Sequence, residues 1–322
     1  MSSLMMVQQR HGDLGSYELP WILDRNGERV PGRENERRVS ELCNGLKRHA
    51  GVRSHTADVS REQTQDILSK LHDPNYLAAL ACLKSQDPVL VPALAEPGLQ
   101  PDTPVCAPVI EIAREGVATA IAAARHTVAG ARFAYALCRP PGHHAGPAFL
   151  GGYCYLNNAA AAAQTLHDGG FKSVGILDLD LHYPNGTSAI VERLASTRLY
   201  SLNGSPGANL PWARVYPRTE REHLVTFHTE PVPDAYLSAV AACTEKLSGC
   251  VEAIVLSLGY DTVAEDPHGS WSFVPEIFLE VGRLLTATGL PVCVIQEGGY
   301  LLDTLAECSH AFAIGLLWED TL

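Results

Sequence analysis

Three side chains with metal-binding chemistry stand at alternate positions after an apolar run. Asp178, Asp180 and His182 follow the run 174–177. Alternate residues of an extended segment point to one side, so two carboxylates and an imidazole project together from the end of a predicted strand. Carboxylates this close repel one another and are costly to bury unless a cation or hydrogen bonds compensate. The alternative is that three polar residues simply lie where the chain leaves the sheet.

A second apolar run ends in a further possible ligand. The run 253–258 is followed by Asp261, whose carboxylate supplies another oxygen. Two oxygens and one nitrogen, from Asp180, His182 and Asp261, leave the fourth position of a tetrahedral ion open. This donor set is typical of a catalytic zinc site rather than of a closed structural one. The sequence therefore predicts one metal where two strands end.

Two other segments predict chemistry beside this metal. His143 and His144 follow Pro-Pro-Gly at the end of the predicted strand 131–138. A histidine pair in a loop is usually solvated, but at a strand end beside a metal it indicates acid–base catalysis. The Gly-Gly pair before Tyr300 is compatible with a plain tight turn and a packed ring. Two glycines also let the backbone approach the site and aim the phenol inward.

The elements that position these residues alternate between helices and strands. Their apolar runs lack alternation, as expected of parallel strands covered by helices on both faces. In such sheets ligands bind outside the carboxyl ends of the strands. The predicted helices are 112–129, 157–168, 186–195, 234–247, 274–287 and 304–317, and the predicted strands are 131–138, 172–180, 198–202, 223–228, 251–258 and 290–296.

We predict an α/β fold in a single domain over residues 1–322, mainly a parallel sheet with helices on both faces. Two segments, 1–33 and the Pro-rich stretch 87–108, are predicted to be irregular surface loops. The basic stretch that begins at Arg37 and Arg38 is interleaved with glutamates and predicts a solvated helix face.

The composition excludes several classes of protein. Hydrophobic residues make up 46% and charged residues 19% of the chain, a globular balance, and the net charge is -12. This charge repels nucleic acid and anionic membranes. No apolar run spans a bilayer, no signal-peptide core is present, and the nine cysteines form no C-x-x-C pair. We expect a cytoplasmic protein with no nucleic-acid or membrane partner, and leave a homodimer open.

Five motifs in this order resemble the histone deacetylase superfamily, including the bacterial acetylpolyamine amidohydrolases and the class II histone deacetylases. This superfamily shares the arginase-like α/β fold. The resemblance covers most of the chain from His72 onward. It implies a zinc-dependent amidohydrolase that removes an acyl group from an acetylated polyamine, another small acylated amine or an acyl-lysine. The motifs are R-P-P-G-H-H-A, G-Y-C-Y-L-N-N-A, D-L-D-L-H-x-x-N-G-T, G-Y-D-T and E-G-G-Y.

The resemblance implies a role for each catalytic residue. His144 would be the general base and acid, and His143, paired with Asp178, its electrostatic partner. Tyr300 would donate a hydrogen bond to the substrate carbonyl. Asn185 stands where the family has an Asp or Asn that orients the second histidine.

The resemblance also implies two cation sites. One Zn²⁺ per chain would be bound by Asp180, His182 and Asp261. A monovalent cation such as K⁺ would draw on backbone oxygens of Asp178, Asp180 and His182, with Ser201 nearby.

Four residues are expected from the resemblance to contact substrate. Tyr153, after Gly152, replaces the Phe that lines the acyl-lysine tunnel in many members. His268 stands where a polyamine-selective relative has Glu and most protein deacetylases have Leu. Asp102 resembles the rim Asp that holds the substrate backbone in protein deacetylases. The acidic chain and the Pro-rich segment near the entrance favour small cationic amines over histone tails.

Two alternatives stay open. One is a catalytically inactive, metal-binding regulatory or binding protein of the same fold, although none of the catalytic residues is lost here. The other is ureohydrolase chemistry, which ranks lower because arginase needs a further Asp where this chain has Pro184.

Overall fold

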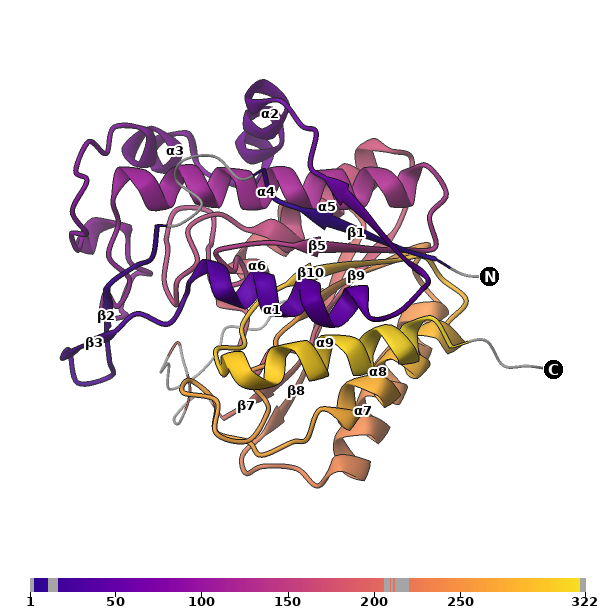
Figure 1. Ribbon diagram of the computed structural model, residues 1–322. Coiled ribbons are helices and arrows are strands. Elements are labelled where there is room, and N and C mark those ends of the chain that lie inside the picture. Colours follow the sequence, from indigo (N-terminus) through magenta and orange to yellow (C-terminus); the bar gives the residue numbers. More distant parts are fainter. Residues whose placement is uncertain (1–2, 11–16, 206–208, 210, 212–219, 319–322) are drawn as a thin grey trace.

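The centre of the molecule is a parallel β-sheet with helices on both faces (Figure 1). The structure is a computed structural model that describes residues 3–10, 17–205, 209, 211 and 220–318. Neighbouring strands of this sheet are all parallel. In order across the sheet, the strands are β4 (Val52–Thr56), β1 (Leu4–Gln8), β5 (Phe133–Leu137), β10 (Val292–Gln296), β9 (Ala253–Leu258), β6 (Val174–Asp178), β7 (Thr197–Gly204) and β8 (Glu222–Phe227).

Two hydrophobic cores lie on the two faces of the sheet. Ala253 and Val255 of β9 pack in one core, and Ile254 and Leu256 pack in the other. Because both faces are buried, β9 is apolar at every position except Ser257. One core includes α1 (Glu36–Lys47), α7 (Pro233–Ser248), α8 (Glu276–Ala287) and α9 (Leu302–Leu316), and the other α2 (Arg61–Leu71), α3 (Pro74–Ala81), α4 (Ala107–Val128), α5 (Asn158–Asp168) and α6 (Asn185–Val191).

The helices of the two cores are separated in space. Figure 1 shows α2 and α4 on one side of the sheet and α1, α8 and α9 on the other. Within the described residues, no helix combines the length and the apolar character that crossing a membrane requires.

The predicted α/β class is confirmed, and the elements predicted from residue 110 onward lie close to the observed ones. Two boundaries differ in an informative way. Strand β6 ends at Asp178, so Asp180 and His182 lie beyond the strand. Helix α4 begins at Ala107, inside the Pro-rich segment 87–108, because proline is tolerated in the first turn of a helix. The rest of that segment contains the short 3₁₀ turn Pro92–Leu94 and isolated bridges that pair Val89 with Val105 and Ala95 with Leu150.

The prediction that the amino-terminal segment 1–33 is an irregular surface loop is wrong, because part of this segment forms strands. Strand β1 lies inside the sheet between β4 and β5, with Leu4 and Met6 fully buried. The segment also forms an antiparallel hairpin of β2 (Trp21–Leu23) and β3 (Arg29–Pro31). Five residues without β-branched enrichment give little local signal, and burial on both faces decides their conformation.

The prediction that the basic stretch forms a solvated helix face is wrong for Arg38 of α1. Arg37 is exposed, but Arg38 is only 1% exposed. Its guanidinium lies 3.3 Å from the buried carboxylate of Glu34, which also accepts hydrogen bonds from Arg139. A buried arginine needs such a partner, and the local charge pattern did not reveal one.

Neighbouring strands β5, β10, β9 and β6 bring their carboxyl ends to one edge of the sheet.

Candidate active site

Three ligand atoms converge where β6 and β9 end. Asp180, His182 and Asp261 are buried, and their ligand atoms lie within 4.8 Å of one another. The Nδ1 atom of His182 is 3.0 Å from Asp180 Oδ1 and 2.9 Å from Asp261 Oδ2. A ring nitrogen carries at most one proton and cannot donate fully to both oxygens. All three atoms therefore face a common point where a cation would be shared.

The backbone around these carboxylates leaves no space for side chains. A Cβ atom on Gly298 would lie 2.6 Å from Asp180 Oδ2 and 2.7 Å from Asp261 Oδ2. Burial and the neighbouring carboxylate of Asp180 raise the pKa of Asp261 to about 7. Burial lowers the pKa of His182, but hydrogen bonds to the two carboxylates outweigh it and raise that pKa to about 10. The cluster therefore demands positive charge, and its two oxygens and one nitrogen fit zinc.

The two adjacent histidines have different partners. His143 Nδ1 lies 3.3 Å from Asp178 Oδ2, and His144 Nδ1 lies 2.6 Å from Asn185 Oδ1. Burial lowers the pKa of His143, but nearby carboxylates outweigh it and raise that pKa to about 10. Burial, followed by the charges of its histidine neighbours, holds the pKa of His144 well below its ordinary value. The pKa values of the two adjacent rings are thus shifted in opposite directions, upward for His143 and downward for His144.

Tyr300 reaches the site through a turn that other segments hold. Gly299 has φ +113°, a conformation that favours glycine. Arg38 Nε donates to the Gly299 carbonyl and its Nη2 to the Glu297 carbonyl, both at 2.6 Å, and its guanidinium lies 4.4 Å from the centre of the Tyr300 ring. Asp266 accepts a hydrogen bond from the Tyr300 amide at 2.6 Å. The sequence did not single out Asp266 or the role of Arg38.

Tyr153 and His268 lie beside Tyr300. The ring centre of Tyr300 is 5.5 Å from that of Tyr153 and 4.8 Å from that of His268. The Tyr153 hydroxyl is hydrogen-bonded to His268 Nε2 at 3.1 Å and accepts from the Arg33 amide at 3.0 Å. Burial lowers the pKa of His268 to about 3, so this ring is neutral.

Asp102 holds the chain before Tyr153 rather than facing solvent. It is 6% exposed, and its Oδ2 accepts a hydrogen bond from the Gly152 amide at 2.9 Å. Tyr153, with φ 66°, is held in the left-handed region by a hydrogen bond from its amide to Thr103 Oγ1. A non-glycine residue in this region is strained and depends on such support. The structure therefore shows Asp102 bound to the backbone just before Tyr153.

Residues 32–316 match the family model described as histone deacetylase domain. The chain belongs to this family. Acetylpolyamine amidohydrolase 1 of Pseudomonas aeruginosa is 36% identical over 212 residues, which are 63% of this chain and 61% of that protein. The acetylpolyamine amidohydrolase of Mycoplana ramosa is 37% identical over 59% of this chain and 58% of that protein. The matched region thus spans less than two thirds of these curated relatives.

Solved structures agree with the resemblance that the motifs indicated. The crystal structure of an acetylpolyamine aminohydrolase from Burkholderia pseudomallei has a TM-score of 0.86 and 27% identity over 98% of each chain. The HDA15 HD domain has a TM-score of 0.78 at 23% identity, covering all of this chain and 90% of that one, and shows the same fold. The family's deacetylases use zinc, and the cluster described above offers a matching set of ligands.

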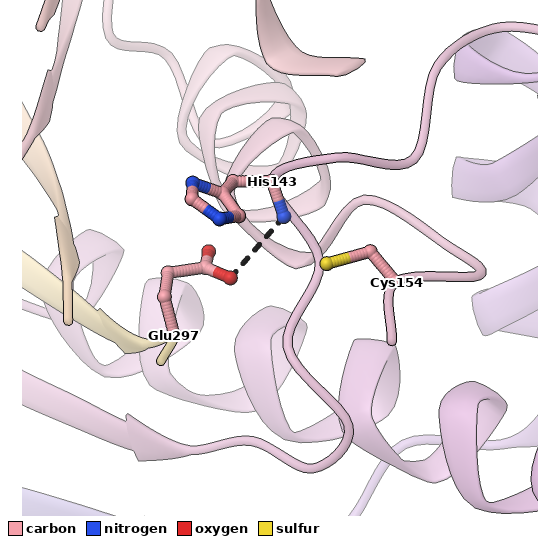
Figure 2. Close-up of side chains that lie close together, drawn as sticks. All are labelled: His143, Cys154 and Glu297. Carbon is pink, nitrogen blue, oxygen red and sulfur yellow. Dashed lines mark hydrogen bonds between the residues drawn. The ribbon is translucent and has the colours of Figure 1, made fainter. Parts of the chain in front are cut away.

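A second buried group in this deacetylase-family chain resembles a metal site but is already satisfied (Figure 2). His143, Cys154 and Glu297 lie together, and Figure 2 shows the Glu297 carboxylate accepting from the His143 amide. The same oxygen accepts from the Gly142 amide at 2.7 Å, and burial raises the pKa of Glu297 to about 7. Burial also holds the pKa of the Cys154 thiol well above its ordinary value. Glu297 therefore braces the loop that carries the histidine pair.

A cavity opens beside His144. Two carboxylates, of Glu96 and Asp102, are among its walls. Ser201 of β7 pairs in the sheet with Asp178 of β6. The residues that line the cavity are Ala95, Glu96, Leu99, Gln100, Asp102, His144, Leu150, Gly151, Gly152, Asn185 and Pro211.

Proposed function

We propose that the chain is a zinc-dependent amidohydrolase that removes an acetyl or similar acyl group from an amine. The observation that carries this proposal is the convergence of Asp180, His182 and Asp261 on one point beside a neutral His144. Relatives named acetylpolyamine amidohydrolases support the same reaction. Asp180, His182 and Asp261 would hold one Zn²⁺.

The metal would supply a Lewis acid for the amide carbonyl and a water of lowered pKa. His144 Nε2 takes a proton from the attacking water, because Nδ1 already donates to Asn185. The same nitrogen then returns the proton to the leaving amine. The Tyr300 hydroxyl donates to the carbonyl oxygen as negative charge develops there. The charged His143, paired with Asp178, adds a positive field beside this oxygen.

The walls of the site favour a small cationic substrate. Glu96 and Asp102 place two carboxylates on the cavity, and the net charge of the chain is -12. His268 is neutral, so a gatekeeper anion is absent at that position. An acetylated polyamine or similar amine fits this arrangement better than a neutral amide, and acyl-lysine is the second substrate class. Backbone oxygens of Asp178, Asp180 and His182 near Ser201 would hold a monovalent cation.

The test is hydrolysis of acetylputrescine, acetylspermidine, free acetyl-lysine and an acetyl-lysine peptide by the zinc-loaded protein. We expect turnover, with the polyamines preferred. Asp180→Ala should lose both zinc and activity, since it removes one of only three protein ligands. Asp168→Ala, a partly exposed carboxylate that pairs with Lys70, is the matched control and should keep both. No hydrolysis across the panel, or normal zinc and turnover in Asp180→Ala, would contradict the proposal.

A further inference from the structure

The amide of Asn185 is held on both sides. Its Oδ1 accepts a hydrogen bond from His144 Nδ1 at 2.6 Å, and its Nδ2 donates to Glu96 Oε2. We infer that Glu96 is a positioning residue that holds the Asn185 amide in the one orientation that leaves His144 Nε2 free to take a proton. This inference rests on the proposed function, because it assigns the proton transfer to His144.

An asparagine at this position needs such a partner, whereas an aspartate would not. A carboxylate presents two equivalent acceptor oxygens, but an amide has one acceptor side and one donor side. With the amide reversed, the NH₂ group would face His144 Nδ1, and the ring would then carry its proton on Nε2. The nitrogen that faces the substrate would no longer be a base. Only one of the two orientations of Asn185 is therefore competent.

Glu96 selects that orientation electrostatically. A carboxylate accepts hydrogen bonds and attracts the Nδ2 donor, whereas the reversed amide would set its oxygen against a negative charge. The contact is half-buried, so water screens it less than a surface pair. The preference for one orientation is thus enforced from the side of Asn185 that faces away from His144.

The backbone fixes Glu96 for this role. The Leu150 amide donates to the Leu94 carbonyl at 2.8 Å, which attaches the chain just before Glu96 to the segment that leads to Tyr153. The Leu99 amide donates to the Glu96 carbonyl at 3.0 Å and closes a turn in which Gly98 has φ +86°. A Pro-Gly pair at the centre of such a turn is typical of type II. The Pro-rich segment therefore presents the carboxylate from a defined point.

Glu96 also lines the cavity beside His144. The alternative role of its charge is to attract an ammonium group of the substrate. Two substitutions test the positioning role. Glu96→Gln removes the charge and leaves an amide that can pair with either orientation of Asn185, and Glu96→Ala removes the partner altogether. Asp87→Ala is the matched control, because it removes one exposed negative charge from the same segment without contact to Asn185.

The first measurement is the protonation site of His144 in the zinc-loaded protein, read from ¹⁵N NMR of the ring at neutral pH. We expect the proton on Nδ1 in the wild type and Asp87→Ala, and a mixture of both ring forms in Glu96→Gln and Glu96→Ala, because neither of these side chains excludes the reversed Asn185 amide. This readout needs no turnover, so it decides the inference even if the chain hydrolyses none of the amines. An unchanged Nδ1 proton in Glu96→Ala would overturn the inference.

The second measurement is kinetic. Glu96→Ala should lower kcat about tenfold with little change in KM, in line with one lost charge-assisted hydrogen bond. Glu96→Gln should lower kcat to a similar extent, because its amide can reverse together with Asn185. In an Asn185→Ala background, Glu96→Ala should have no further effect on kcat. A loss confined to KM, or additive losses with Asn185→Ala, would show that the charge acts on substrate and would overturn the inference.

Discussion

Two histidines that are adjacent in the chain take opposite charge states because their partners differ. His143 faces the carboxylate of Asp178, and an ion pair stabilises its protonated form. His144 faces the neutral amide of Asn185, whose hydrogen bond raises the pKa of this ring less than burial and the neighbouring histidines lower it. The carboxylates of Asp180 and Asp178 both raise the pKa of His143. His144 therefore remains a base near neutral pH, and the difference comes from the carboxylates that surround His143 and the burial of His144 beside two other imidazoles.

The Tyr300 hydroxyl is expected to stabilise the transition state and not the bound substrate. Tyr300→Phe keeps the ring against Arg38 but removes one hydrogen-bond donor. We expect kcat to fall about 10²- to 10³-fold, because such donors act on charge that develops during the reaction. Zinc content and substrate binding should persist. Steady-state kinetics with metal analysis checks this, and a kcat within about threefold of the wild type would assign the turn a purely structural role.

Helix α1 positions the same tyrosine from a distance through Arg38. Its two hydrogen bonds to carbonyls of the turn come from a residue about 260 positions earlier in the chain. Arg38→Met should lower kcat about 10- to 100-fold while zinc stays bound, because hydrogen bonds from a charged donor each contribute about 1.5 to 3 kcal/mol. The Glu34 carboxylate would still be paired with Arg139. Arg37→Met, on the exposed face of the same helix, is the control and should match the wild type.

The end of helix α2 carries a pH-dependent contribution to stability. His72 is 1% exposed, donates from Nδ1 to the Gly146 carbonyl at 2.8 Å and accepts at Nε2 from the Asn157 amide at 3.2 Å. Burial lowers the pKa of His72 to about 4, so its neutral form is the one that the fold holds. The unfolded chain takes up this proton first as the pH falls. The contribution is therefore complete above about pH 6.5 and is lost as the pH falls toward 4.

Linkage gives the size of this effect. Between pH 7.5 and 5.5 the His72 site should remove about 1.4 kcal/mol from the free energy of unfolding. His72→Gln should be less stable at pH 7.5 but lose about 1.4 kcal/mol less than the wild type over this interval. Urea unfolding at both pH values measures the difference, with the exposed His228→Gln as control. A variant that keeps the full wild-type pH dependence would place the titrating group elsewhere.

Across the whole molecule, the sequence predicted what local pattern encodes. Asp178, Asp180, His182 and Asp261 follow apolar runs, and the parallel sheet necessarily gathers strand ends at one edge, so the cluster could be foreseen. Strand β1 could not be predicted from the sequence, because its five residues form a strand only by pairing with β4 and β5, which come later in the chain.

The contacts of Arg38 and Glu96 that support the site could not be predicted from the sequence for a related reason. Arg38 appeared as one charge among several on a helix, and Glu96 as a residue of a Pro-rich loop. Their partners, the Glu297 carbonyl and the Asn185 amide, lie in segments far away in the sequence. A periodic pattern reports which face of an element is buried, but it carries no information about which remote polar group a buried side chain meets.

The net charge of the whole chain predicts a salt-dependent KM for cationic substrates. The molecule carries -12, and Glu96 and Asp102 add carboxylates at the cavity. Such a field concentrates cations near the entrance at low ionic strength, and at 0.1 M salt the screening length falls to about 10 Å. The KM of acetylspermidine, a dication, should therefore rise about threefold between 20 and 300 mM NaCl, and that of the monocation acetylputrescine should rise less. The kcat values should stay constant, because the reacting groups are buried and poorly screened. Equal or absent salt effects on the two KM values would mean that long-range charge does not select the substrate.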